Sequence, residues 1–401
     1  MDRPTAQPDP GPALDAALDA AALLECAREL VRVPSENPPG DERAAAAAVR
    51  PYLDALGCQV VEVEPAPGRV SLVGILDSGR PGLTLAVNGH LDVVPAGPLD
   101  AWEHPPYEAV VADGVLHGRG ACDMKGAIAA ALQAASALVA SGASWHGRLS
   151  FQLVADEETL GPHGTRALLR AGLAGADAAV VAEPTGMRAA IAERGAAWYL
   201  MRTLGRAAHG SRPADGVSAI AAMAKLVPAV LDQVWERTHP LLAGPSVNVG
   251  VIRGGDKINM VPAWCEIEVD RRTLPGETAE QVTAELRTII ERLRATDPDF
   301  HAEVHQTAFE VPCEVEPEAP VVSAATGALD ALGLDTYLIG MSGATDARIL
   351  VHEASTPAIV LGPGDLSLAH STAERVPVAE LVTAARAYAR LYAAFLAPTP
   401  G

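Results

Sequence analysis

The sequence predicts an α/β protein with a mostly parallel central sheet, helices on both faces of that sheet, and an inserted ferredoxin-like α+β domain. Strand-like and helical segments alternate up to about residue 182, the pattern of a covered, mostly parallel sheet. After Glu193 the order becomes strand–helix–strand–strand–helix–strand, which is that of a ferredoxin-like unit. The alternation resumes after Pro312. We therefore expect a disordered lead (1–12), one discontinuous domain (13–193 and 310–401) and an insert (194–309).

Each element is predicted from its local pattern: apolar residues at helical spacing indicate helices, and short Val-, Leu- and Ile-rich runs indicate strands. Outside the insert, the expected helices are 13–33, 42–56, 128–141, 164–171, 320–332, 345–351 and 378–396. The expected strands there are 59–63, 70–76, 83–94, 148–155, 178–182, 335–339 and 357–361. Within the insert we expect strands at 194–204, 246–252, 261–271 and 301–309, with helices at 216–233 and 277–293.

Length, charge and cysteine usage narrow the class of protein. A chain of 401 residues exceeds the size at which one core normally grows, which fits two domains. The net charge of −20 repels phosphate backbones and anionic lipid, so we expect neither nucleic acid nor membrane as a partner. The 5 cysteines form no CxxC pair, as is typical of buried thiols in a reducing compartment. With no signal-peptide pattern at the start, a cytoplasmic location is expected.

The stretch GRGACDMKGA (118–127) is central to the prediction. Apolar Val110 and Val111, the turn pair Asp113-Gly114 and the helical run that follows indicate a strand end, a tight loop and a helix start. Asp123 at its centre can project into the crevice above the strand ends, where open α/β sheets bind ligands. Taken alone, an Asp before a helix is more often an N-cap.

Other potential metal ligands follow further predicted strands. NGHLDVVPAG (88–97) carries His90 and Asp92, which face the same side of an extended segment, so the Asp92 carboxylate can reach a ring nitrogen of His90. The alternative there is a strand-end His bonded to a turn Asp. The acids of ADEETLGPHGT (155–165) would repel each other unless a cation neutralises them, although a solvated helix start capped by Asp156 is the alternative. The remaining candidates are Glu183 in VVAEPTG (180–186) and His370 in LGPGDLSLAHSTAERV (361–376).

This mixture of imidazole and carboxylate without thiolate suits zinc, or a harder divalent metal such as cobalt or manganese. The set exceeds the complement of one catalytic zinc and fits two metal ions per chain that share a bridging carboxylate.

These motifs, in this order over about residues 20–396, resemble the di-zinc amidohydrolases and peptidases that include acetylornithine deacetylase, succinyl-diaminopimelate desuccinylase, the aminoacylases and carboxypeptidase G. The resemblance implies a zinc-peptidase-like catalytic domain and a lid and dimerisation insert. It implies that Asp92 orients a ligand, that Asp123 bridges both zincs and that Glu157 is the general base. The metal ligands that it implies are His90, Asp123, Glu158, Glu183 and His370.

The resemblance extends to substrate binding. In AAHGSRPADG (207–216), His209 matches the His that reaches the partner subunit's site in family dimers and polarises the scissile carbonyl. Asn259 and Arg272 fall where the family holds a substrate carboxylate, and SGATDAR (342–348), with Gly343 and Thr345, resembles its Gly-rich substrate loop. The departures from the family pattern, Cys122, Ala127 and His117, remove no ligand.

We therefore expect a homodimeric hydrolase that cleaves the amide bond of an N-acyl amino acid, of the deacetylase or desuccinylase type. A dipeptidase or carboxypeptidase of the same family, acting on a dipeptide-like substrate, is the alternative enzyme. A non-catalytic metal-binding dimer is the alternative from a different class, and an intact Glu157 argues against it. The residues leave open the acyl group and the amino-acid side chain.

Overall fold

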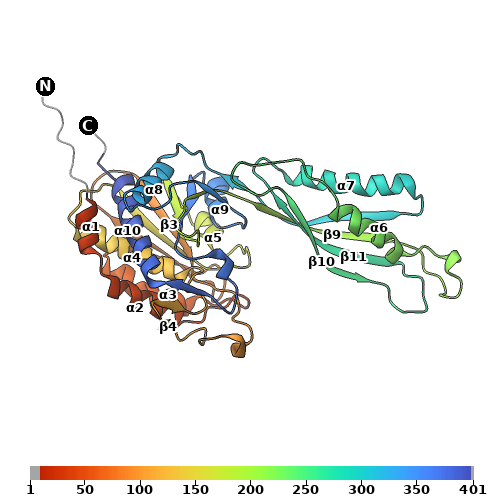
Figure 1. Cartoon of the computed structure of the whole chain (residues 1–401), viewed down its shortest axis with the longest axis horizontal. Helices are drawn as coiled ribbons and strands as arrows, with labels where there is room; N and C mark the ends of the chain where they lie inside the picture. The colour runs from red at the N-terminus through yellow and green to blue at the C-terminus, as the bar shows by residue number, and fades with distance from the viewer. Residues whose placement is uncertain (1–9, 399–401) are drawn as a thin grey trace, which may run out of the picture. The chain divides into compact units, whose positions relative to one another are not determined.

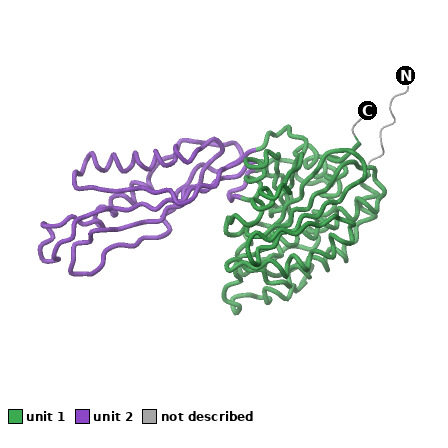
Figure 2. The backbone as a smooth tube through the Cα atoms, turned by 180° about the vertical axis from the view of Figure 1, so that it is seen from behind, with its two compact units in different colours: residues 1–191, 315–339, 345–401 green, residues 192–314, 340–344 purple. Residues whose placement is uncertain are grey.

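The structure is a computed structural model that describes residues 10–398 (Figure 1). Its chain divides into two compact units (Figure 2). Unit 1 comprises the chain up to Ile191, Val315–Ile339 and the chain from Thr345 onward, and unit 2 comprises Ala192–Glu314 and Gly340–Ala344. Of the expected disordered lead, residues 1–9 lie outside the described part, whereas Gly11 and Pro12 already belong to a helix, because the first helix begins at Gly11.

Unit 1 is built on a mixed sheet whose centre is parallel. The strands in spatial order are β1 (Gln59–Val63), β2 (Ser71–Asp77), β6 (Arg148–Val154), β3 (Thr84–His90), β7 (Ala178–Val181), β15 (Ala358–Val360), β8 (Ala190–Glu193) and β13 (Cys313–Glu314), with β14 (Ile339–Met341) beside β8. The pairs β6–β3, β3–β7 and β7–β15 are parallel, whereas the pairs to either side are antiparallel. The α/β class is confirmed, and the four strands at the centre of the sheet are parallel to one another.

Helices cover this sheet. They are α1 (Gly11–Ala17), α2 (Ala20–Val31), α3 (Arg43–Ala55), α4 (Lys125–Ala140), α5 (Thr165–Arg170), α8 (Pro320–Asp330), α9 (Ala347–Glu353) and α10 (Val378–Phe395). Helix α4 packs against α10, α2 and α1, while α9 packs against α5, β7 and β15. Figure 1 shows α4 and α10 on one side of β3 and α5 and α9 on the other. The central strands are therefore buried on both faces, which explains why they consist mainly of apolar residues without a polar alternation.

Two expected elements differ in the structure. The single helix expected at 13–33 is two helices, because Asp19 leaves the helical conformation and its side chain caps α2 by accepting from the amides of Ala21 and Ala22. The strand expected at 335–339 does not form over the described residues 335–338, and β14 begins only at Ile339.

The strand before Asp123 belongs to a separate sheet rather than to the central one. Strands β4 (Val110–Ala112) and β5 (Val115–His117) form a hairpin, and β16 (Arg375–Pro377) pairs with β5. Asp113 and Gly114 at the turn both have positive φ, 48° and 77°, as a two-residue hairpin turn of the primed type requires. This hairpin brings the segment after His370 beside the segment before Asp123.

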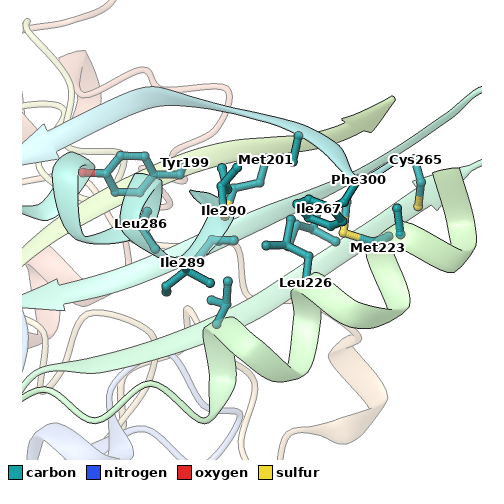
Figure 3. Packing of buried hydrophobic residues seen from close by; sticks show 14 of the residues in the cluster. Tyr199, Met201, Met223, Leu226, Cys265, Ile267, Leu286, Ile289, Ile290 and Phe300 are labelled. Atoms are coloured by element: carbon teal, nitrogen blue, oxygen red, sulfur yellow. The ribbon is translucent and has the colours of Figure 1, made fainter. Parts of the chain in front are cut away.

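Unit 2 is a ferredoxin-like α+β unit, as expected. Its elements are β9 (Gly195–Leu204), α6 (Ala219–Leu231), β10 (Ser246–Gly254), β11 (Trp264–Thr273), α7 (Ala279–Thr296) and β12 (His301–Glu310). The strands pair antiparallel in the order β10-β11-β9-β12. Figure 3 shows the core between sheet and helices, where Met201 and Ile267 from the strands meet Leu226 and Leu286 from α6 and α7. Alternate residues of β9 therefore point to the core, and Trp198 between them is exposed.

Across the described residues, none of the helices has the length and apolar character needed to cross a bilayer.

Candidate functional site

The candidate metal ligands lie at the carboxyl ends of the four parallel strands of unit 1. His90 is the last residue of β3, Glu158 follows β6, Glu183 follows β7, and His370 lies in the loop after β15. Asp123 immediately precedes α4. Carboxyl ends of neighbouring parallel strands meet at one edge of a sheet, which is where open α/β folds hold their ligands. The topology therefore gathers residues that are up to 280 positions apart, as the distance from His90 to His370 in the sequence shows.

Asp123 lies between two imidazoles. Its Oδ1 is 2.9 Å from Nε2 of His90, and its Oδ2 is 3.3 Å from Nε2 of His370. Glu183 Oε1 lies 3.5 Å from the same nitrogen of His90, and Glu158 Oε2 lies 2.9 Å from that of His370. Each carboxylate oxygen of Asp123 thus faces one His-and-Glu pair, which is the arrangement that a carboxylate bridging two cations needs.

The donor set fits divalent metal ions. In two groups of three, His90–Asp123–Glu158 and His90–Glu157–Glu183, the potential ligand atoms lie within 4.8 Å of one another. Imidazole nitrogens and carboxylate oxygens are the ligands of catalytic zinc and of harder divalent ions. Because Glu157 belongs to the second group, its carboxylate lies beside His90 and Glu183.

The charges of this cluster influence each other strongly. Burial lowers the pKa of His90, but the nearby Glu183 and Asp123 outweigh it and raise the pKa well above its usual range. Hydrogen bonds to Asp123 and Glu158 raise the pKa of His370 to about 10. Burial, reinforced by the neighbouring acids, raises the pKa of Glu157 and of Glu183 well above the ordinary carboxyl value. Several acids concentrated in a buried site carry an energetic cost that cations relieve.

Asp92 is bonded differently from the expectation. Nδ1 of His90 lies 2.8 Å from the main-chain oxygen of Asp92, whereas the nearer carboxylate oxygen is 3.7 Å away. The carboxylate instead accepts hydrogen bonds from the backbone amides of Glu157 and Glu158, at 3.2 and 3.1 Å. The β3 strand end thus places the main-chain carbonyl, not the side chain, against the imidazole. Either partner fixes the tautomer and orientation of a ligand His.

The residues expected to bind substrate lie mainly in unit 2. His209 is exposed, its Nδ1 is 2.8 Å from Ser211 Oγ, and it forms an isolated bridge with Met260. Gly210 donates to the main-chain oxygen of Asn259 at 2.8 Å, so unit 2 brings the His209 and Asn259 segments together.

Arg272 in β11 is 34% exposed and donates two hydrogen bonds to Asp270 Oδ2, at 3.0 and 3.2 Å. In the Gly-rich loop, Gly343 belongs to unit 2 and is half-buried. Thr345 belongs to unit 1, is buried, and accepts from the amide of Ala347.

Sequence reasoning missed Glu374, whose carboxylate binds the backbone of the Asp123 loop. Oε1 of the buried Glu374 accepts from the backbone amides of Gly120, Cys122 and Asp123, at 2.8, 3.1 and 3.1 Å. Its other oxygen pairs with the buried Arg119. Glu374 stands directly before β16, so the pairing of β16 with β5 places it there. The sequence AHSTAERV does contain Glu374, shortly after His370 and directly before an arginine. Its hydrogen-bond partner Asp123 lies 251 positions earlier in the chain, so no local pattern links the two residues.

Arg194 was also missed. Its buried guanidinium, at the start of unit 2, donates to Ser246 Oγ, and its Nε has no hydrogen-bond partner among the described residues. Burial lowers the pKa of Arg194, and the positive charges of Arg272 and Arg271 lower it further. Two guanidinium groups near one another in a protein form a strong site for a carboxylate.

Known proteins match both sequence and fold. The profile of Peptidase family M20/M25/M40 matches residues 86–394. An acetylornithine deacetylase of Myxococcus xanthus is 33% identical over 354 residues, which cover 86% of each chain. A succinyl-diaminopimelate desuccinylase of Phenylobacterium zucineum is 30% identical over 402 residues, covering 96% of this chain and 100% of the relative.

Among solved structures, the aminopeptidase PepT of Bacillus cereus superposes with a TM-score of 0.80 at 23% identity, covering 94% of this chain and 99% of that one. A dinuclear metal-binding peptidase of Bacillus subtilis superposes with a TM-score of 0.74 at 18% identity, covering 94% and 98%. The fold class and the predicted amide hydrolase are thereby confirmed, since the chain belongs to peptidase family M20/M25/M40.

Proposed function

We propose that this chain hydrolyses the amide bond of an N-acyl amino acid, in the manner of a deacetylase or desuccinylase, with two divalent metal ions. The observation that carries the proposal is Asp123, whose two carboxylate oxygens face His90 and His370 separately. Relatives named acetylornithine deacetylase and succinyl-diaminopimelate desuccinylase, aligned over almost the whole chain, support the substrate class.

In this proposal His90, Asp123 and Glu183 hold one ion, and Asp123, Glu158 and His370 hold the other. We take zinc as the native metal, with cobalt or manganese as substitutes, because the donors are nitrogen and oxygen only. When bound, such ions supply a water whose pKa falls from 15.7 to about 7, so that hydroxide is available at neutral pH.

Glu157 acts as the general base. Its carboxylate lies beside His90 and Glu183, and its backbone is fixed by the hydrogen bond from its amide to Asp92. Burial raises the pKa of Glu157 above the ordinary carboxyl value, and a raised carboxyl pKa makes it a better proton acceptor near neutrality. Glu157 takes the proton of the attacking water and passes it to the amine that leaves.

Unit 2 recognises the amino-acid moiety. Arg272 and Asn259 hold its carboxylate, and the buried Arg194 adds a second guanidinium that suits a planar anion. His209 donates to the developing oxyanion, and the loop with Gly343 and Thr345 contacts the substrate backbone. We further propose that the chain is a homodimer in which His209 of each subunit serves the site of the other.

A panel of substrates tests the proposal. Purified enzyme with zinc or cobalt is assayed for free amine release from N-acetyl and N-succinyl amino acids and from dipeptides. We expect turnover of at least one N-acyl amino acid and loss of activity after chelation, restored by the metal. Preferential cleavage of dipeptides would replace the deacylase by the peptidase of the same family, and full activity of a verified metal-free sample would refute the metal centre.

A further inference from the structure

A buried polar network holds the loop that carries Glu157 and Glu158. Arg69 lies two residues before β2, and its side chain is 8% exposed. Its Nη2 lies 2.7 Å from Asp156 Oδ1 and 2.9 Å from Glu42 Oε1. Its Nη1 donates to Asn37 Oδ1 at 3.2 Å. The guanidinium of Arg69 therefore joins the segment of Asn37 and Glu42 to Asp156, the residue directly before Glu157.

Asn37 transmits this anchoring to the site. Because its Oδ1 faces a donor of Arg69, its amide nitrogen faces the acids, donating to Asp92 Oδ2 at 2.8 Å and to Asp156 Oδ1 at 3.2 Å. Asp92 in turn accepts from the amides of Glu157 and Glu158. The chain of hydrogen bonds from Arg69 to the backbone of the proposed base and ligand thus runs through only two side chains.

The surrounding backbone is shaped to admit these groups. A Cβ at Gly40, where φ is +83°, would lie 1.3 Å from Nη1 of Arg69. A Cβ at Gly161 would lie 1.8 Å from Oδ2 of Asp156. Asp156 itself has a φ of 64°, a conformation that a non-glycine residue keeps only when its surroundings enforce it. The two glycines therefore leave space for the Arg69 guanidinium and the Asp156 carboxylate, and Asp156 itself keeps a strained backbone conformation.

We infer that Arg69 and Asn37 are positioning residues, which hold the Glu157–Glu158 loop where its carboxylates meet the metal ions and the attacking water. Without the guanidinium, Glu42 and Asp156 would be buried acids with no cation within hydrogen-bond distance among their described partners, and the loop would shift to reach solvent. Arg suits the position because its planar fork serves several acceptors at once, which a lysine ammonium does only in part.

The experiment compares Arg69→Met, Arg69→Lys and Asn37→Ala with the wild type. Arg390→Met is the matched control, since it removes another arginine–carboxylate pair of unit 1, that of Arg390 with Asp15, which joins two helices. Each metal-free protein is titrated with Co²⁺ and followed by its visible absorption. Melting temperature, kcat and KM for an N-acyl amino acid are measured on the same preparations.

We expect Arg69→Met and Asn37→Ala to bind Co²⁺ at least tenfold more weakly with an altered spectrum, and to lower kcat more than they raise KM. Arg69→Lys should recover part of both, and Arg390→Met should bind Co²⁺ as the wild type does. If Arg69→Met does not fold, the Co²⁺ affinity and kcat of Asn37→Ala test the inference alone. That variant keeps the pairs of Arg69 with Glu42 and Asp156 and is therefore expected to fold.

Wild-type affinity and spectrum in Arg69→Met and Asn37→Ala would overturn the inference, whatever their melting temperatures, and would make the network purely structural. The inference rests on the proposed metal centre, and different results would refute the metal centre and the positioning role. A wild-type chain that binds no Co²⁺ refutes the metal centre itself, whereas a binding wild type with unaffected variants refutes only the positioning role.

Discussion

The two units differ in how far their candidate site residues are buried. In unit 1 most of the polar cluster is buried: His90 is 1% exposed and Asp123 6%, and they are hydrogen-bonded to each other, although the His370 side chain is 55% exposed. In unit 2 the helices and the sheet enclose an apolar core, and the ion pair of Arg271 with Glu277 is also buried, whereas His209 and Asn259 are exposed. The comparison teaches that the candidate ligands of unit 1 are held in place by bonds to one another, whereas His209 and Asn259 of unit 2 remain accessible to a ligand that is not part of the chain.

The largest expected effect tests unit 1. Glu157→Gln keeps the size of the side chain and the backbone amide that bonds to Asp92, but it removes the proton acceptor. We expect kcat to fall by roughly 10²–10⁴-fold, the usual contribution of a positioned acid–base group. Metal content by mass spectrometry and the melting temperature should stay those of the wild type. Near-normal turnover would show that another residue is the base.

The next effect tests whether unit 2 takes part in chemistry. His209→Ala removes a proposed oxyanion donor, a type of group worth about 10²–10³-fold in kcat elsewhere, while the metal content stays unchanged. His209→Ala and Glu157→Gln chains are then mixed under subunit exchange. If His209 acts across a dimer, about a quarter of the wild-type site activity should return, since half the dimers are mixed and each has one intact site. Proven exchange without recovery would place His209 within its own chain or outside the reaction.

A third prediction asks whether the units are stabilised separately. Leu286 of α7 is completely buried in the unit 2 core (Figure 3), so Leu286→Ala should destabilise the protein by about 2–5 kcal/mol. We expect calorimetry to show an earlier transition for unit 2, while Co²⁺ absorption persists until unit 1 unfolds. A single transition in which metal and unit 2 are lost together would contradict the separation of the two regions.

The smallest effect lies on the outside of unit 1. Asp15 of α1 accepts two hydrogen bonds from Arg390 of α10, each 2.8 Å long, which hold the pKa of Asp15 below its usual range. A lowered pKa stabilises the fold above the unfolded pKa near 3.9, and that contribution is lost as the pH falls through the folded pKa. Because the carboxylate is 34% exposed, Asp15→Asn should cost less than about 1 kcal/mol at pH 7. Denaturant titrations should show the variant and the wild type converging in strong acid, and a constant difference would exclude the ion pair as its cause.

The sequence predicted the elements with strong periodicity and the motifs that end them. The strand expected at 59–63 is β1 without change, and His90, Asp123 and Glu183 were all selected from strand-end motifs. The β4–β5 hairpin was missed although Asp113-Gly114 is a hairpin signal, because Val110, Val111 and this turn pair were interpreted as a strand end and a tight loop, with no second strand after the turn.

The supporting residues were beyond sequence reasoning for a different reason. Asn37 bonds to Asp156 across 119 positions, and Arg69 bonds to it across 87. Neither lies in a periodic pattern or beside a candidate ligand, so only the folded chain shows that they act on the same loop. Local patterns therefore identify the atoms that do chemistry more readily than those that hold them.

The pairing of β8 with β13 has a consequence for how such a chain can be assembled in evolution. Ala192 and Glu193 of β8 are hydrogen-bonded neighbours of Glu314 and Cys313 of β13, so the segment that leads into β9 and the segment that follows β12 lie side by side. A domain whose two ends are adjacent can be inserted, lost or exchanged at a single position of the chain, because a short turn is sufficient to join the remaining ends. Unit 2 is therefore a segment that could have been inserted into unit 1 in a single event, and a chain shortened between β8 and β13 would test whether unit 1 folds without it.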